Sequence, residues 1–244
     1  MRIFLAFGTP SLFGETAWHG YNLSQTRHRS LRFGRSRRNL PFPLRVFPVN
    51  QQDRITKLAK TDFAEAFKLA QTISGVRERI QSLGWVARYA PAAEVTRVIV
   101  AVRNAAEKST DHYACMMALA WPLRALQETG HGKQIPTLLK TALQRSTMVQ
   151  PAASQAEALK LLIHAVLPHD LRTVNPAVAA LKAVASETHW RVVRALVDVA
   201  FLINAFDRQT ATDIAKVIPI ENKRNATMER ISSGETMQVR PFFW

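Results

Sequence analysis

The stretch FAEAFKLAQTISGVRERIQSLGWVARYA, residues 63–90, decides the fold. Its apolar residues recur three and four positions apart, which places them on one face of a helix. The breaker Ser74-Gly75 divides the stretch into two such helices. The first face consists of Phe63, Phe67 and Ala70, and the second of Val76, Ile80, Leu83 and Val86. The stretch therefore predicts a helix pair with a short turn.

The first face recurs along the chain, with successive copies 35, 37, 42 and 34 residues apart. Such a period is typical of stacked helix pairs. The further copies are Val98, Val102, Ala105; Ile135, Leu139, Ala142; Ala177, Leu181, Val184; and Ala211, Ala215, Ile218. Partner faces lie between them, at Met116, Leu119, Leu123, Leu126; Ala156, Leu159, Ile163, Val166; and Val192, Leu196, Val199, Ile203, Phe206. No alternating strand pattern occurs in this part of the chain.

Turn and cap residues agree with this division. Asp62, Asp111 and Asn175 are predicted N-caps, and Pro122 is expected to kink its helix near Ala118. We predict an all-α fold, a right-handed stack of about five antiparallel helix pairs over residues 53–231, preceded by a disordered basic segment. No transmembrane segment is predicted, because every apolar run is shorter than a spanning helix needs.

The period and register over residues 55–231 resemble the HEAT and tetratricopeptide families of α-solenoids, most clearly in residues 63–90. The ordered tetratricopeptide signature of Trp, Leu-Gly, Tyr, Ala, Phe and Pro is absent, so no family residue is carried over. The resemblance implies an interaction scaffold that presents an extended surface to a partner.

The two ends of the chain differ from its body. Residues 1–52 are rich in Arg and Pro, and residues 1–50 hold eight Arg and one acid, Glu15. We predict disorder there, and the segment is interpreted as a transit peptide, a nucleic-acid-binding arm or an upstream extension. The expected compartment is the cytoplasm, or a mitochondrion or other organelle if the segment is a transit peptide. The C-terminal tail, residues 232–244, ends in Pro241-Phe242-Phe243-Trp244; it is expected to dock on the last repeat as a cap, or to be read by another protein.

One pattern indicates a binding surface. The residue after the central apolar position of each recurring face is basic, and stacking would align these residues into a ladder. A simpler reading keeps the stem of each side chain on apolar surface and its head in water. The basic ladder consists of Lys68, Arg103, Lys140, Lys182 and Lys216.

Catalytic and metal-binding motifs are absent from the sequence. One cysteine, Cys115, excludes an internal disulfide and a Cys-rich zinc site. His164 and His169 do not share a helix face, and no nucleophile elbow or phosphate loop occurs. Trp85 and Trp121, 36 residues apart, are expected to be core residues of successive repeats. We therefore predict no cofactor, no metal and no enzymatic activity.

The charge distribution favours a protein partner over nucleic acid. The net charge is +15, of which residues 1–50 carry +7 (eight Arg minus one Glu) and the rest +8 (25 basic minus 17 acidic). The excess on the helical body is moderate, so the first hypothesis is a non-enzymatic scaffold that binds a protein or acidic peptide. The alternative is a helical-repeat protein that binds the nucleic-acid backbone through the same basic surface.

Overall fold

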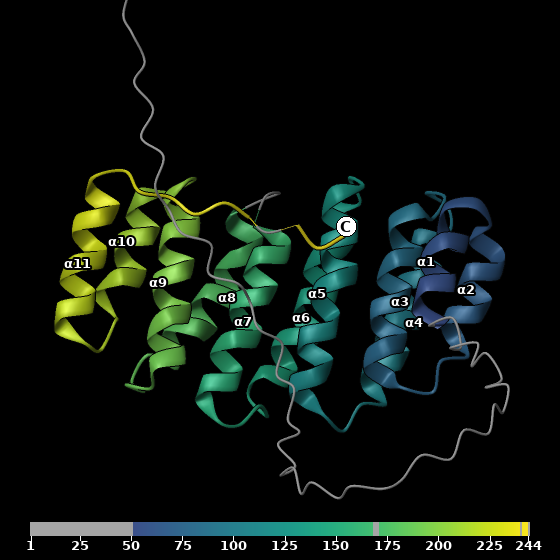
Figure 1. Ribbon diagram of the computed structural model, residues 1–244, viewed down its shortest axis with the longest axis horizontal. Helices are drawn as coiled ribbons and strands as arrows, with labels where there is room; N and C mark the ends of the chain where they lie inside the picture. Colours follow the sequence, from purple (N-terminus) through teal and green to yellow (C-terminus); the bar gives the residue numbers. More distant parts are fainter. Residues whose placement is uncertain (1–50, 168–170, 240, 244) are drawn as a thin grey trace, which may run out of the picture. The chain divides into compact units, whose positions relative to one another are not determined.

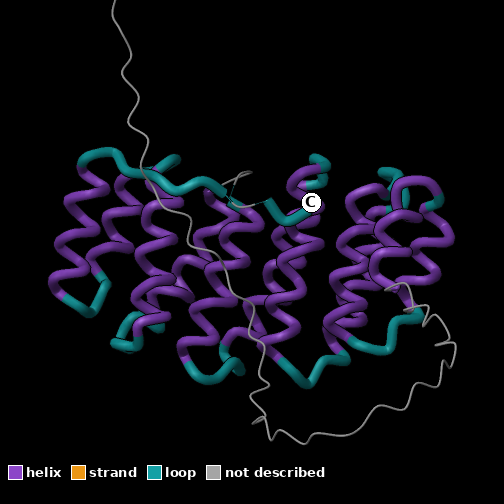
Figure 2. Tube along the Cα trace, viewed as in Figure 1, coloured by secondary structure: helices purple, strands orange, loops and turns teal. Residues whose placement is uncertain are grey.

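The computed structural model describes residues 51–167, 171–239 and 241–243, and over these residues it contains eleven α-helices, one short 3-10 helix and no strand (Figure 2). The predicted all-α class is confirmed. The elements are α1 (Gln51–Thr61), α2 (Phe63–Gln71), α3 (Val76–Tyr89), α4 (Val95–Glu107), α5 (His112–Glu128), η1 (Gly132–Gln134), α6 (Ile135–Ser146), α7 (Ala152–Val166), α8 (Leu171–Ala183), α9 (Trp190–Asn204), α10 (Arg208–Lys216) and α11 (Glu221–Ser232).

The predictions for the N-terminal segment, residues 1–52, fall almost wholly outside the described residues. Of that range the structure describes Gln51 and Gln52, which begin α1. The interpretations of residues 1–50 as a disordered tail, a transit peptide or a binding arm stay predictions.

The helices follow one another along the stack in chain order (Figure 1), and their contacts divide them into two layers. The odd layer consists of α1, α3, α5, α7, α9 and α11, and each of its helices contacts the next one in the layer. The even layer consists of α2, α4, α6, α8 and α10. Each even helix packs on the odd helix before it, whereas neighbouring even helices contact each other less. Grooves lie between α2 and α4, between α4 and α6, and between α6 and α8.

The recurring apolar faces make the core between the layers. Every residue of the five first faces is buried except Phe63 and Val184, which are half-buried. Among the partner faces, Val76 is half-buried, and Phe206 is 54% exposed because it lies beyond the end of α9. The sequence periodicity predicted no apolar face in α1 or α11, and few residues of these two helices are buried. Such polar terminal helices are expected where a stack ends and has no further neighbour.

Two of the three predicted N-caps are confirmed. The backbone N–H of Glu65 donates to Asp62 Oδ1 at 3.0 Å, and that of Ala114 donates to Asp111 Oδ1 at 2.8 Å. Asn175 is wrong as a cap: α8 begins at Leu171 and runs through Asn175 and Pro176. Asn175 and Pro176 are exposed, so the ring of Pro176 lies on the solvent-exposed side of α8 and not on its packed face.

The C-terminal tail turns back from α11 and follows the odd layer (Figure 1). The left-handed Gly234 (φ 86°) ends α11, and the Met237 N–H then donates to the Phe201 carbonyl of α9 at 3.1 Å. Further on, Phe242 meets Trp121 of α5 and Phe243 meets Trp85 of α3. The tail therefore docks, but the expected position on the last repeat is wrong, because the aromatic partners of its apolar end lie on α3 and α5.

Candidate functional site

The basic ladder lies in the even layer. Each of its members belongs to a different even helix and directly follows a buried residue of the core. The structure therefore brings the five to equivalent positions of one layer, as their common register in the sequence requires. The members and their helices are Lys68 of α2, Arg103 of α4, Lys140 of α6, Lys182 of α8 and Lys216 of α10.

The members differ in their surroundings. Lys68 and Lys140 are exposed, and within the described part of the chain neither forms an ion pair. Arg103 is half-buried beside the groove between α4 and α6, and its buried Nε has no hydrogen-bond acceptor among the described residues. Arg103 is therefore partly packed between the helices and also carries a donor group that lacks an acceptor.

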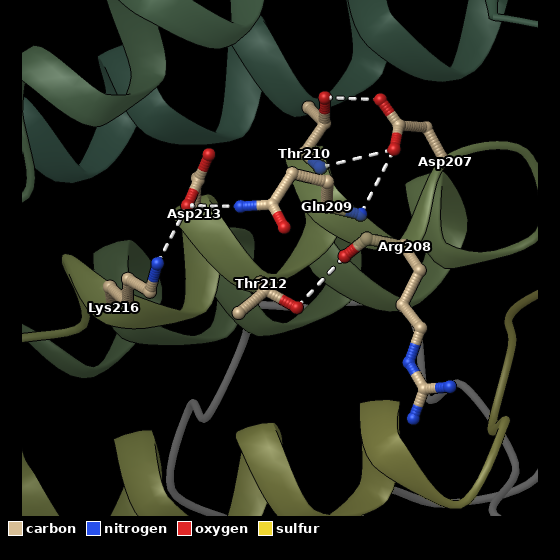
Figure 3. A network of polar contacts seen from close by, with 7 residues as sticks. All are labelled: Asp207, Arg208, Gln209, Thr210, Thr212, Asp213 and Lys216. Atoms are coloured by element: carbon tan, nitrogen blue, oxygen red, sulfur yellow. Dashed lines mark hydrogen bonds and ion pairs between the residues drawn. The ribbon is translucent and has the colours of Figure 1, made fainter.

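An acidic residue offsets the charge at the α10 end of the ladder (Figure 3). Lys216 Nζ donates to Asp213 Oδ1 at 2.9 Å, and Gln209 Nε2 donates to the same oxygen at 3.2 Å. These hydrogen bonds, with a further contribution from the charge of Lys182, lower the pKa of Asp213. Both Lys182 and Lys216 therefore act on one carboxylate of the protein itself, which weakens this end as a site for an anion.

The groove between α6 and α8 has the opposite character. Its apolar lining comes from Pro136, Leu139, Leu143 and Pro176. Lys140 and Arg172 add two exposed cations, and neither α6 nor α8 contains an Asp or Glu. Charge complementarity therefore favours an anionic ligand with an apolar part at this groove.

Two arginines of this region lie outside the ladder register and were missed by the sequence analysis. Arg172 lines the groove between α6 and α8, whereas Arg145 joins α6 to the end of α4. The guanidinium of Arg145 donates to the carbonyl oxygens of Ala106 and Ser109, the latter at 3.0 Å. The sequence did contain a sign of this basic region, because residues 135–146 and 171–183 include no Asp or Glu. A count of charge by helix would have found Arg172.

Groups suited to catalysis are not gathered in the described residues. Burial raises the pKa of the Cys115 thiol, which makes the reactive thiolate less available. Within the described ranges, no three potential metal ligands lie together. None of the described helices combines the length and apolarity needed to cross a membrane.

Comparison with known proteins assigns no family to the chain. No family model matches it. No curated protein matches it either. Among solved structures, the chain is similar to the crystal structure of Ton1535 from Thermococcus onnurineus NA1, with 12% sequence identity and a TM-score of 0.46. The similarity covers 75% of this chain and 58% of that one.

Proposed function

We propose that the protein is a non-enzymatic helical-repeat interaction protein that binds an acidic segment of a partner protein across the even layer. The observation that carries this proposal is the groove between α6 and α8, where apolar side chains adjoin the exposed Lys140 and where neither helix contains an Asp or Glu. A segment in which Asp or Glu flanks an apolar residue matches both features of the groove.

Other ladder members extend this surface in both directions. Arg103 of α4 lies beside the next groove and has a buried N–H without an acceptor among the described residues. Lys182 follows Lys140 on the neighbouring helix, although Asp213 reduces its effect. Each exposed contact contributes only about 0.2–1 kcal/mol, so affinity depends on several contacts together and falls as salt rises.

Nucleic acid is the competing ligand. A phosphate backbone would use the cations but leave the apolar lining of the groove without a partner, whereas a peptide uses both. The two ligands also differ in their dependence on salt, which is steeper for duplex DNA because counterions are released.

The test reverses charge around the groove. We would change Lys140, Arg172 and Lys182 to Glu in the full chain and measure binding of a labelled acidic peptide with interspersed Leu residues, at about 50 and about 300 mM salt. The expected result is at least a tenfold loss of affinity, roughly the sum of three weak contacts and the repulsion that replaces them. The matched control changes Lys57, Lys60 and Lys223, exposed residues of α1 and α11, to Glu.

Because the unmodified and the charge-reversed chains share residues 1–50, the eight Arg of that segment affect both measurements equally. An acidic peptide that binds both chains alike would contradict the proposal. Stronger binding of duplex DNA than of peptide, lost in the same variant, would establish the nucleic-acid alternative instead.

A further inference from the structure

The odd layer carries a second, independent surface, where two helices repeat a short motif. Trp85-Val-Ala-Arg88 of α3 and Trp121-Pro-Leu-Arg124 of α5 share the pattern Trp-x-x-Arg, 36 residues apart. Residues three apart lie on one face of a helix, so each Trp and its Arg point the same way. Trp85 and Trp121 were expected in the core; both are half-buried and meet the tail, and Trp121 also packs against the core.

Each copy of the motif holds one aromatic ring of the tail. The Phe243 ring meets Trp85 edge-on at 4.7 Å between ring centroids, and Arg88 lies over it at 4.6 Å. The Phe242 ring meets Trp121 edge-on at 5.4 Å, with Arg124 at 5.9 Å. Edge-on aromatic pairs and cations over rings are both favourable contacts. Phe242 is only 4% exposed as a result.

Glu128 fixes the two arginines in place. Its Oε2 lies 3.1 Å from Arg88 Nη2, and its Oε1 accepts a hydrogen bond of 2.7 Å from Arg124 Nε. We call the set Trp85, Arg88, Trp121, Arg124 and Glu128 the aromatic clamp. Since one carboxylate contacts both guanidinium groups, residues of α3 and α5 themselves help to orient the two arginines of the clamp.

The tail leaves part of the clamp unsatisfied. Arg124 Nη1 is buried and has no hydrogen-bond acceptor within the described residues. An unpaired buried donor is costly, and it gains most from a ligand that places a carboxylate or carbonyl oxygen beside it. In the sequence of the tail, the residue before Pro241-Phe242-Phe243 is Arg240, which is a cation like Arg88 and Arg124.

We propose that the aromatic clamp is a binding site for an extended segment of a partner protein that carries two successive aromatic residues beside an Asp or Glu, and that the chain's own tail occupies the site until such a segment displaces it. In the sequence of the tail, the two residues before its rings are Arg240 and Pro241, neither of which is an acid. Emptied of the tail, α3 and α5 would expose two tryptophans next to each other, the kind of apolar patch that marks an interaction site.

A second copy of the chain is a weaker occupant than such a partner. The tail of another copy offers the same contacts as the tail already present, which is tethered at a roughly millimolar effective concentration. Only a segment with higher intrinsic affinity can displace the tail at the lower concentrations usual for proteins, and the unsatisfied donor of Arg124 provides that difference.

The test uses the full chain with Phe242→Ala and Phe243→Ala, which empties the clamp while every helix is kept. The probes are a fluorescein-labelled peptide TMQVRPFFW, the sequence of residues 236–244, and the same peptide with Asp in place of its Arg. We expect both peptides to bind the emptied chain at least tenfold more tightly than the unmodified chain, because the tethered competitor is gone. The Asp peptide should bind more tightly than the Arg peptide. Adding Arg88→Gln and Arg124→Gln should abolish binding, whereas adding Arg77→Gln, an exposed residue of α3, should not.

Several results would overturn the proposal. One is the absence of peptide binding to the emptied chain up to about millimolar peptide, which equals the effective concentration of the tethered tail. Another is loss of the folded state, by circular dichroism, in the Phe242→Ala/Phe243→Ala chain, because the tail would then be a permanent part of the fold. A third is a concentration-dependent dimer of the unmodified chain in sedimentation that the two Phe substitutions abolish, which would make a second copy the occupant.

Discussion

The two layers of the helical stack are built from the same periodic helices but are held together differently. Odd helices contact their neighbours directly, and Gly84 of α3 lies against the backbone of Trp121 and Pro122 of α5. Neighbouring even helices are separated by grooves that long polar side chains bridge. Arg97 of α4 covers Phe67 of α2, and Gln134 donates to Thr96 at 3.2 Å.

Because of this difference, the residues that hold a layer together and the residues that can contact a ligand are arranged differently in the two layers. The closely packed layer holds the chain's own C-terminal tail across its surface, through rings and cations that project from neighbouring helices. In the open layer the grooves themselves are available to a ligand, and its cations divide between structural bridges and free positions. Arg145 belongs to the first kind and Lys140 to the second, which is why a basic residue in the even layer is not by itself a binding residue.

The largest expected effect compares one leucine from each layer. Leu123→Ala in α5 should lower the free energy of unfolding by about 3–5 kcal/mol, because Leu123 is enclosed and its removal leaves a cavity. Leu139→Ala in α6 should cost less, about 2–3 kcal/mol, because Leu139 lines the groove between α6 and α8, where water or neighbouring side chains can fill the space. Urea denaturation of both variants measures the two losses. Equal losses of unfolding free energy in the two variants would show that the even layer is as tightly packed as the odd layer.

The next effect concerns the bridges of the even layer. Arg145→Ala should cost about 2 kcal/mol, because the carbonyl groups of Ala106 and Ser109 lose a charged donor. Lys140→Ala on the same helix should change stability by no more than about 0.5 kcal/mol, because Lys140 is exposed. Thermal unfolding followed by circular dichroism compares them. A loss in Lys140→Ala as large as in Arg145→Ala would show that the ladder is structural.

The close approach of α3 and α5 gives a smaller effect. A Cβ atom on Gly84 would lie 2.8 Å from the Trp121 Cβ and 2.9 Å from the Pro122 nitrogen. Gly84→Ala should therefore destabilise the protein by about 1–2 kcal/mol, since the cost of overpacking exceeds the gain in helix propensity. Gly75→Ala is the control, because its Cβ would meet only the flexible end of the Glu78 side chain. A stabilised Gly84→Ala protein in chemical denaturation would mean that α3 and α5 can move apart freely.

The smallest effect tests a cap in the even layer, Asp207 at the start of α10 (Figure 3). Hydrogen bonds from the Thr210 hydroxyl, the Thr210 N–H and the Gln209 N–H lower the pKa of Asp207. Asp207→Ala should cost about 1 kcal/mol at neutral pH, whereas Asp207→Asn should cost only a few tenths because Asn also caps.

The pH dependence of that cap has a definite sign. Because the pKa of Asp207 is lower in the folded state, its contribution is complete above the unfolded value of about 3.9 and is lost as pH falls through the folded pKa. The stability difference between the unmodified chain and Asp207→Asn should therefore be constant at neutral pH and shrink below about pH 4. Thermal midpoints measured on both chains from neutral to acidic pH give this difference directly. A difference that grows on acidification would contradict the assignment.

Local sequence determined the helices, most of their buried faces and two of the three proposed caps. Spacings of three and four residues fix which side of a helix is apolar, and short-range hydrogen bonds such as those of Asp62 and Asp111 fix where it begins. Asn175 failed as a cap because local preference for a turn at Asn-Pro does not outweigh the packing of Val174 and Ala177, which are buried on either side of it.

What only the tertiary structure decided is how residues distant in the chain meet. Both Trp-x-x-Arg motifs are visible in the sequence, but their role depends on a tail more than 100 residues away that returns to α3 and α5. The ladder register likewise follows from periodicity, and the pairing of Lys216 with Asp213 is also local, because the two lie three residues apart on α10. The hydrogen bonds of Arg145 to the carbonyl groups of Ala106 and Ser109, in contrast, depend on how α6 packs against the end of α4. Periodicity fixes the face on which a residue lies, and long-range packing fixes what that face meets.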